Sequence, residues 1–347
     1  MRIAVLGTGW GARVSVPAFQ AAGCDVVALW SRRRERAEEE AERLGVPLAT
    51  TDFAEIFASP NVDAVAIHTP PAMHLDLCRV AFEAEKHVLC DKPFAMNVTE
   101  AREMATLAKA TDRIAILNYE FRHAPLSLQI KDLLDRGAIG QFHHATVEMR
   151  GWSPLAGPGI AWRLDPAQGG GILNELGSHY IDRLRQWFGE ISNVNAQLAS
   201  FPPPDSDPEL TTEDWLGATF SFTQGGFATL SQSWVEGVEP GASITIVGSE
   251  GSLALSCTDF MLSCGELTIG RGRRGEQAPE VVPPPSSQQE FEREGHVIAA
   301  SRLLIAAFAK GIETGVSPHP DFGDGLQSQI AIDAMRESAA TGCIVSL

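Results

Sequence analysis

The first strand-like run of this chain breaks directly into a glycine-rich turn. The apolar residues Ile3 to Leu6 are followed by Gly7-Thr8-Gly9-Trp10-Gly11-Ala12, a G-x-G-x-x-A pattern with alanine at the third, helix-packing position. A buried strand that turns through glycines into a helix presents free backbone N–H groups at the positive end of that helix, which suits a pyrophosphate. We therefore expect residues 7 to 12 to bind a dinucleotide.

The end of the second apolar run indicates which dinucleotide is preferred. Residues Val26 to Trp30 lead into Ser31-Arg32-Arg33, whereas a site for NAD usually carries Asp or Glu here to bind the ribose 2′-OH. A hydroxyl and guanidinium groups suit a 2′-phosphate, because Arg offers planar, charge-assisted donors. The sequence predicts NADP, with NAD as the alternative, bound by Ser31 and Arg32 and contacted by Arg36. The other interpretation is that these arginines form the solvated first turn of a helix.

Composition limits the class of protein. The 347 residues, 44% of them hydrophobic, suffice for two packed domains. A net charge of −17 argues against nucleic acid or an anionic membrane as a partner. The chain lacks a signal-like start and any apolar run of the roughly 18 residues that a membrane span needs, so we expect a cytoplasmic protein. Its 6 cysteines include no C-x-x-C pair, which predicts neither a metal site nor a disulfide framework.

The first part of the chain alternates buried-strand patterns with amphipathic helical stretches, which is typical of parallel βαβ units. Strands are expected at 2–6, 25–30, 63–67, 87–90 and 114–117, and helices at 33–44, 73–84 and 99–110. The predicted fold class is therefore α/β. Its N-terminal domain, residues 1–120, should be a dinucleotide-binding Rossmann domain built on a doubly wound parallel sheet.

The pattern changes after residue 120. Helices are expected near 125–136, 172–188, 295–314 and 323–341, and a strand near 142–150. Residues 218–222 and 227–234 alternate apolar and polar side chains across a Gln-Gly-Gly turn, which predicts a hairpin with one buried face. A second hairpin is expected around residues 249–251. We expect residues 121–347 to form an α+β domain on a largely antiparallel sheet, for substrate binding and assembly into a homodimer or homotetramer, with its last helices able to pack on the first domain.

Ligands of a doubly wound sheet lie outside the carboxyl ends of the strands, so the residues that follow each strand are site candidates. His68-Thr69-Pro70 follows the strand at 63–67, and His74 opens the next helix. Asp91-Lys92-Pro93 follows the strand at 87–90. Asn118 and Arg122 come after the last strand of this domain, and we expect them to contact the substrate.

These motifs resemble those of the glucose-fructose oxidoreductase and inositol dehydrogenase family. Its T-P-x-x-x-H and E/D-K-P signatures are matched at Thr69-Pro70 with His74 and at Asp91-Lys92-Pro93. The likeness extends over nearly the whole chain, through Trp162-Arg163, Gly169-Gly170-Gly171, Gly177-Ser178-His179 and Asp324-Gly325. The resemblance implies that Thr69, Pro70, His74, Asp91 and Lys92 contact the cofactor, and that Trp162 and Arg163 reach toward it from the second domain.

Lys92 is the strongest catalytic candidate. A lysine beside a nicotinamide ring that becomes cationic on oxidation experiences like-charge repulsion and partial desolvation, and both favour its neutral form. In that form it can exchange a proton with the reacting hydroxyl or carbonyl group of a substrate. The alternative is a surface lysine at a strand end.

Glu175 and His179 form the second catalytic candidate. They are four residues apart, so on an α-helix they share one face and can meet. A histidine can act as acid or base near neutral pH, and a carboxylate can orient it. The resembling enzymes carry Asp at the position of Glu175, so this chain departs from the family pattern there. We expect Lys92, Glu175 and His179 to act in catalysis and to contact the substrate.

The leading interpretation is an NADP-dependent oxidoreductase that transfers a hydride between the nicotinamide cofactor and a sugar, a cyclic polyol or a related hydroxy or keto compound. The resemblance also allows an NAD-dependent glycosidase that uses transient oxidation, or a non-catalytic dinucleotide-binding regulator. The arginines after the second strand argue against the glycosidase. Lys92 and His179 argue against the regulator.

Overall fold

The computed structural model describes residues 1–151, 161–201, 212–237, 239–272 and 278–347, apart from the side chains of residues 161 and 162. By the contacts between its residues, the chain divides into two compact units. The first unit holds Met1–Glu120 and Glu294–Gln329, and the second holds Phe121–Arg293 and Ile330–Leu347. The last helix, α10 (Phe322–Thr341), therefore contributes residues to both units.

The first unit is built on a six-stranded sheet in the order β3-β2-β1-β4-β5-β6, in which every pairing is parallel. Its strands are β1 (Arg2–Leu6), β2 (Asp25–Trp30), β3 (Leu48–Thr50), β4 (Ala64–Ile67), β5 (His87–Cys90) and β6 (Ala115–Leu117). Its helices include α1 (Val16–Ala21), α2 (Arg34–Leu44), α3 (Phe53–Phe57), α4 (His74–Glu83), α5 (Val98–Lys109) and α9 (His296–Thr314). The strand order reverses between β1 and β4, so the predicted doubly wound sheet is confirmed, and ligands are expected at that switch point.

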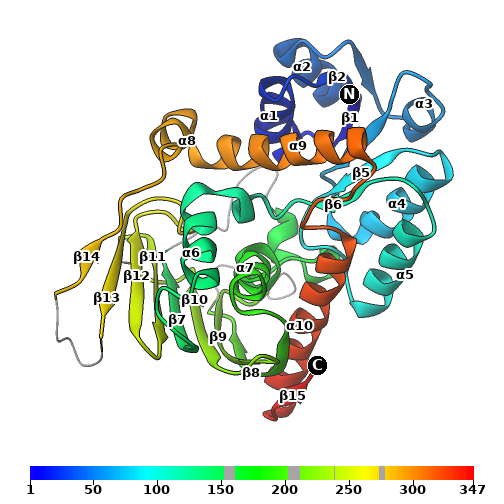
Figure 1. Cartoon of the computed structure of the whole chain (residues 1–347). Coiled ribbons are helices and arrows are strands. Elements are labelled where there is room, and N and C mark those ends of the chain that lie inside the picture. Colours follow the sequence, from blue (N-terminus) through cyan, green and yellow to red (C-terminus); the bar gives the residue numbers. More distant parts are fainter. Residues whose placement is uncertain (152–160, 202–211, 238, 273–277) are drawn as a thin grey trace. The chain divides into compact units, whose positions relative to one another are not determined.

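Each face of this sheet has its own core, because successive residues of a strand point to opposite faces. Ile3 and Val5 of β1 pack with residues of α1 and α9, whereas Ala4 and Leu6 pack with residues of α4 and α5. Figure 1 shows α9, in orange, running beside α1, in dark blue. A C-terminal helix thus completes one face of the sheet that begins the chain.

The short elements β3 and α3 were not predicted. They contain three and five residues, and runs of that length carry too little periodicity to be distinguished from a loop. The longer elements lie close to their predicted bounds, since a four- to six-residue apolar run next to an amphipathic helix is a strong local signal.

The second unit is built on a nine-stranded sheet in the order β14-β13-β12-β11-β7-β10-β9-β8-β15. Its strands are β7 (Phe142–Arg150), β8 (Ile191–Ala199), β9 (Trp215–Phe222), β10 (Phe227–Ser233), β11 (Gly241–Gly248), β12 (Gly251–Cys257), β13 (Glu266–Arg271), β14 (Glu280–Val281) and β15 (Val345–Ser346). Both predicted hairpins are present, as β9 with β10 and β11 with β12. The pairing of β7 with β10 is parallel, so the sheet is largely antiparallel, as predicted.

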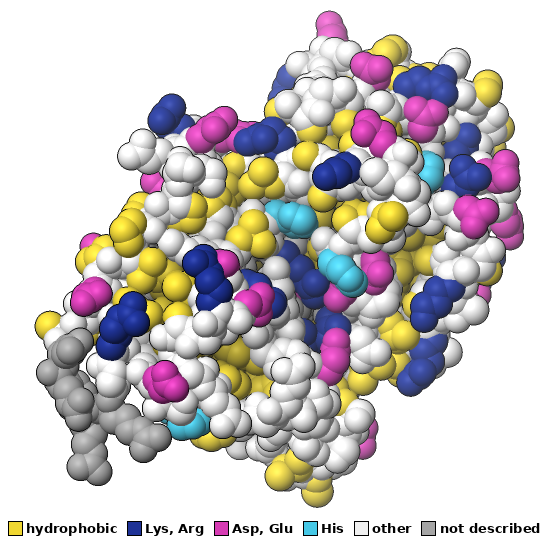
Figure 2. All heavy atoms as spheres, viewed as in Figure 1, with side chains coloured by type: hydrophobic (Ala, Val, Ile, Leu, Met, Phe, Trp, Pro, Cys, Tyr) yellow, Lys and Arg dark blue, Asp and Glu magenta, His cyan; other side chains and the backbone are white. Residues whose placement is uncertain are grey.

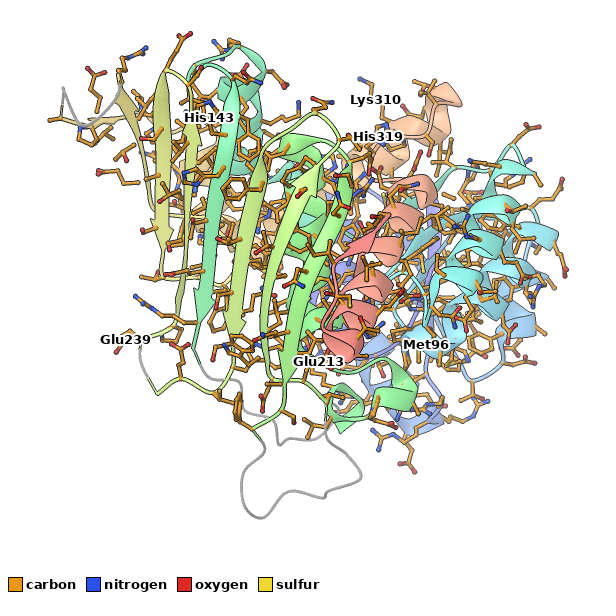
Figure 3. All side chains as sticks on the ribbon, turned by 90° about the horizontal axis from the view of Figure 1, so that it is seen from below. Met96, His143, Glu213, Glu239, Lys310 and His319 are labelled. Carbon is orange, nitrogen blue, oxygen red and sulfur yellow. The ribbon has the colours of Figure 1, made fainter. Side chains whose placement is uncertain are left out.

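The helices α6 (Pro125–Asp135) and α7 (Ser178–Phe188) cover one face of the second sheet. Ile130 of α6 and Leu184 of α7 belong to the same buried cluster as Val147 and Met149 of β7. Burial alternates along β7 residue by residue, so Glu148 between them is exposed. Figure 3 shows the strands of this sheet side by side, with His143 near the start of β7.

Charged side chains of both signs are mixed on the surface. Figure 2 shows Lys and Arg side chains, in dark blue, beside Asp and Glu side chains, in magenta, over the visible face. Among the described helices, none alone combines the length and apolarity of a membrane span, although α8 (Gln288–Glu294) and α9 meet that criterion together as a bent pair.

Candidate active site

The glycine turn after β1 is shaped by contact with the segment that follows β4. Gly7 has a φ of +130°, and a Cβ atom there would lie 2.4 Å from the backbone oxygen of His68. A Cβ atom on Gly11 would lie 2.8 Å from Cγ1 of Val5. Around Gly9 the space is open, with no described atom within 4 Å of such a Cβ. The fold therefore requires Gly7 and Gly11, whereas Gly9 leaves room where a pyrophosphate would approach the backbone.

Three buried polar atoms at this edge of the sheet have no hydrogen-bond partner among the described residues. They are Nε1 of Trp10, Nε2 of His68 and Oγ1 of Thr69. Buried polar atoms are nearly always hydrogen-bonded, so an orphan group needs an explanation. Trp10 belongs to the glycine turn, and the other two residues directly follow β4. A polar ligand at this edge would satisfy these atoms, so the residues present fit the predicted dinucleotide.

The glycine turn allows a matched test of fold against binding. Gly7→Ala should destabilise the protein, because alanine at a positive φ costs about 1–3 kcal/mol before the clash with His68 is counted. Gly9→Ala should leave the melting temperature nearly unchanged and weaken dinucleotide binding at least about tenfold. Thermal unfolding and fluorescence titration with NADPH measure the two effects. Unchanged affinity in Gly9→Ala would mean that the turn does not face the dinucleotide.

Ser31 connects the end of β2 to the glycine turn. Oγ1 of Thr8 donates a hydrogen bond to Oγ of Ser31 at 3.2 Å, and the backbone N–H of Arg33 also donates to that oxygen at 3.4 Å. Ser31 is buried. Ser31, which is predicted to bind the 2′-phosphate, is thus hydrogen-bonded to the turn that is predicted to bind the pyrophosphate.

The arginines that follow Ser31 differ in how far they are already paired. Arg36 forms ion pairs with Glu39 at 3.1 Å and with the buried Glu40 at 2.7 Å, so its guanidinium is held on α2. Arg32 and Arg33 are exposed and form no ion pair with any residue that the structure describes. Arg32 therefore remains the stronger candidate for a phosphate contact, and Arg36 the weaker one.

Three neighbouring strands end in one hydrogen-bonded network. Oδ2 of Asp91, after β5, lies 2.9 Å from Nδ1 of His68, after β4, and Oδ1 accepts hydrogen bonds from Nδ2 of Asn118 at 3.0 Å and from the N–H of Lys92 at 2.9 Å. Burial alone would raise the pKa of Asp91, but His68, Lys92 and Asn118 lower it well below its usual range. Asp91 is therefore a fixed anion at the centre of this edge. His68, which the sequence placed here without a role, is its partner.

His74, a predicted cofactor contact, is hydrogen-bonded to two neighbouring segments of the first unit. The ring is fully buried, with Nδ1 3.1 Å from the backbone oxygen of Phe94 and Nε2 2.9 Å from that of Thr69. Burial also lowers its pKa. Both ring nitrogens are thus used within the protein, where His74 joins the segments after β4 and β5 and so positions Thr69.

The pairing of Glu175 with His179 was predicted for an α-helix, but the segment that carries Glu175 is not α-helical. Residues Leu173–Gly177 form a π-helical turn that continues into α7. Nη2 of Arg163 forms an ion pair with Oε1 of Glu175 at 2.6 Å. The N–H of Gly171 donates to the backbone oxygen of Arg163 at 2.9 Å, and the N–H of Glu175 donates to that of Gly171 at 3.0 Å. The glycine turn at 169–171 therefore brings this pair together.

His179 lies in the first turn of α7, where it is buried and packed against a neighbouring ring. His179 is 5% exposed, and its ring lies edge-to-face with Phe121 at a centroid distance of 5.6 Å. One turn later, Asp182 accepts hydrogen bonds from Nε and Nη2 of Arg122, both at 2.6 Å, and this pair is buried. The guanidinium of Arg122, which was predicted to contact the substrate, thus forms two charge-assisted hydrogen bonds with Asp182.

The structure gathers the predicted residues into two groups, one in each unit. The group in the first unit consists of Gly7, Thr8, Gly9, Trp10, Gly11, Ala12, Ser31, Arg32, Arg36, Thr69, Pro70, His74, Asp91, Lys92 and Asn118. The group in the second unit consists of Arg122, Arg163, Glu175 and His179. Trp162 lies in the 3-10 turn Ala161–Leu164, and its side chain falls outside the described residues.

Two family models match the chain. Residues 1–119 match the model described as oxidoreductase family, NAD-binding Rossmann fold, and residues 127–254 match the GFO/IDH/MocA C-terminal domain. An uncharacterized oxidoreductase of Synechocystis sp. is 28% identical over 353 residues, with 97% of this chain and 94% of the relative covered. A D-xylose 1-dehydrogenase (NADP(+)) of Haloferax volcanii is 26% identical over 355 residues, with 100% of both chains covered.

The fold is shared with a levoglucosan dehydrogenase. Its structure in complex with NADH and L-sorbose superposes with a TM-score of 0.87 and 23% sequence identity, and the match covers 100% of this chain and 98% of that chain. At this identity the likeness establishes a common architecture for both units of the chain.

Proposed function

Because the chain belongs to the GFO/IDH/MocA family of NAD(P)-binding oxidoreductases, we propose that it is an NADP-preferring dehydrogenase or reductase of a sugar, a cyclic polyol or a related hydroxy or keto compound. The observation that carries the cofactor preference is the end of β2, where Ser31 is bound to Thr8 and no carboxylate takes the place of the usual Asp or Glu. The relative named as an NADP(+)-dependent xylose dehydrogenase supports this preference.

The proposed cofactor residues all come from the first unit. Backbone N–H groups of the turn around Gly9 would bind the pyrophosphate, Ser31 and Arg32 the 2′-phosphate, and Oγ1 of Thr69 a polar group of the cofactor. When bound, the nicotinamide ring exchanges a hydride with the carbon that carries the reacting oxygen.

Lys92 and His179 are the proposed proton-exchanging groups. Lys92 follows β5 directly and is partly buried, beside the fixed anion Asp91. His179 is held by Phe121 in the first turn of α7. An ammonium or imidazolium group within hydrogen-bond reach of the reacting oxygen donates a proton when a carbonyl is reduced, and the corresponding amine or imidazole accepts one when a hydroxyl is oxidised.

Glu175 is proposed to act together with Arg163 rather than as the orienting group of His179 alone. The ion pair at 2.6 Å fixes the carboxylate, whose side chain is only 11% exposed. A carboxylate held by a guanidinium presents its oxygens in a fixed direction, and carboxylate oxygens accept hydrogen bonds. It can therefore accept a hydrogen bond from a substrate hydroxyl, as we expect for a polyol or a sugar.

The proposal is tested by cofactor affinity and turnover. Fluorescence titration should give a dissociation constant for NADPH at least about tenfold below that for NADH, the effect of one charge-assisted contact. A screen of aldoses, anhydrosugars and cyclic polyols with NADP⁺ and NAD⁺ should then identify a substrate by reduction of the cofactor. Equal affinities for NADPH and NADH would refute the NADP preference, and dinucleotide binding without any turnover would favour a regulator.

Arg32→Ala should weaken NADPH binding by about 1–3 kcal/mol, because it removes a charge-assisted donor to the 2′-phosphate. NADH binding should hardly change, since that cofactor lacks this phosphate. The matched control is Arg34→Ala, since Arg34 lies at the start of α2 and pairs with Glu38 at 3.6 Å. If both variants lose NADPH affinity equally, the effect comes from general positive charge and not from a phosphate site.

A further inference from the structure

Two cysteines and one aspartate meet in the loop between β12 and β13. Cys257 ends β12, Asp259 follows two residues later, and Cys264 lies just before β13. The Sγ atoms of Cys257 and Cys264 and one carboxylate oxygen of Asp259 all lie within 4.8 Å of one another. Thiolates and carboxylates are zinc ligands, and tetrahedral Zn–S bonds of about 2.3 Å place neighbouring ligand atoms about 3.8 Å apart. The three groups thus need to close by no more than about 1 Å.

The carboxylate of Asp259 is already oriented by its own loop. Oδ1 accepts hydrogen bonds from the N–H groups of Met261 at 2.6 Å and Ser263 at 3.3 Å, and Oδ2 accepts one from Oγ of Ser263 at 2.7 Å. Ligating carboxylates in metal sites are typically held by such outer hydrogen bonds. The loop is itself anchored, since Nε2 of Gln288 donates to the backbone oxygen of Ser263 at 3.0 Å.

A second observation comes from α7, which packs against this loop. Arg183 is 1% exposed, and none of its guanidinium nitrogens has a hydrogen-bond partner among the described residues. Its guanidinium lies 5.3 Å from the ring of Tyr180 and 5.5 Å from that of Trp187, and the hydroxyl of Tyr180 donates to the backbone oxygen of Phe260 in the loop. A buried arginine stays charged, and the groups that act electrostatically on Arg183 include Asp259 and Cys257 of this loop as well as Asp182.

We propose that Cys257, Asp259 and Cys264 form a three-ligand zinc site beside the buried Arg183, with its fourth position open to water. Two thiolates and a carboxylate carry three negative charges, and a divalent cation leaves one, which equals the charge of the guanidinium in size. Zinc binding would release two thiol protons to solvent, and a water molecule would fill the fourth position.

Arg183 also selects the kind of metal. A hard cation such as Mg²⁺ binds oxygen and not thiolate, so it would pair with Asp259 alone and place net positive charge beside a buried guanidinium. A thiophilic cation binds all three ligands and avoids this repulsion. The spacing C-x-D-x₄-C has no C-x-x-C pair, which is why the sequence predicted no metal site.

The test begins with metal content. Protein purified from zinc-supplemented cells, with any histidine tag removed, should contain about one zinc per chain by elemental analysis, as expected for a single site. Cys257→Ser and Cys264→Ser should each lose it, whereas Cys343→Ser should keep it, because Cys343 is exposed and lies outside the loop. Circular dichroism and NADPH titration show whether each variant is folded.

A second measurement uses the unmodified protein, so it does not depend on whether a variant folds. Reduced, metal-free protein titrated with Co²⁺ should develop a thiolate-to-cobalt charge-transfer absorption that zinc abolishes, and zinc should raise its melting temperature reversibly. Absence of zinc in the purified protein together with no cobalt band after reduction would refute the site. A Cys257–Cys264 disulfide in protein that binds no metal even after reduction would also refute it and assign the pair to redox chemistry.

Discussion

Lys92→Met is expected to lower turnover by about 10²–10⁴, the usual contribution of a positioned acid or base. Methionine retains the length of the side chain, so the fold and the dinucleotide turn at Gly7 to Ala12 should be unaffected. Dinucleotide affinity should stay within a few-fold of its original value. Steady-state kinetics with the substrate found by the screen and fluorescence titration with NADPH measure the two quantities.

The control for Lys92 is Lys109→Met. Lys109 is exposed at the end of α5 in the same unit, so its loss removes the same charge without touching the strand ends. Turnover of this variant should be unchanged. Near-normal turnover of Lys92→Met would instead assign Lys92 to a surface role, and a large loss of dinucleotide binding would make it a cofactor ligand.

Asp182→Ala is expected to destabilise the protein by about 3–5 kcal/mol, because it leaves the buried guanidinium of Arg122 without its carboxylate. Both bonds of this pair are 2.6 Å long, and Asp182 is 1% exposed. Replacing both partners by apolar residues, as in Arg122→Met with Asp182→Leu, should recover much of the loss. Chemical denaturation followed by tryptophan fluorescence measures the difference in unfolding free energy.

The exposed pair Arg136 and Asp132 on the surface of α6 is the matched control for this buried pair. Asp132→Ala should produce little change in stability, because exposed ion pairs contribute little. If Asp182→Ala and Asp132→Ala destabilise the protein equally, burial does not decide the strength of the Arg122 pair. If Asp182→Ala is neutral, Arg122 is free to rearrange toward solvent or substrate.

The architecture of the first unit was predictable because its signals are local. The apolar run before Gly7, the strand ending at Ser31 and the motif after β5 each need only a few neighbouring residues to be recognised. In a parallel sheet the carboxyl ends of the strands share one edge. This rule placed Asp91 and Asn118 at the same edge, and the structure joins them by a hydrogen bond. The parallel pairing of β7 with β10 has no such local signal, because it depends on elements far apart in the chain.

The sequence did not predict which charged side chains form ion pairs with one another. Arg163 and Glu175 are twelve positions apart and meet through the turn at 169–171, while Arg122 and Asp182 lie on separate helical segments. Periodicity placed Glu175 on an α-helix, but Leu173–Gly177 form a π-helical turn instead. The turn is closely packed at Gly177, where a Cβ would lie 3.1 Å from Leu173 and 3.3 Å from Gln232. Such packing has no signature in residue type.

The Asp91 network restricts changes in length within three strands of the first sheet. His68, Asp91 and Asn118 meet only because β4, β5 and β6 end at matching heights. Inserting or deleting one residue within any of these strands would turn its last side chain to the opposite face and separate the three groups. The opposite edge has a constraint of its own, since Nζ of Lys86, between α4 and β5, donates to the backbone oxygens of Ser59 at 2.9 Å and Val62 at 2.8 Å. Natural variation in length and engineered insertions should therefore be absent from β4, β5 and β6 themselves.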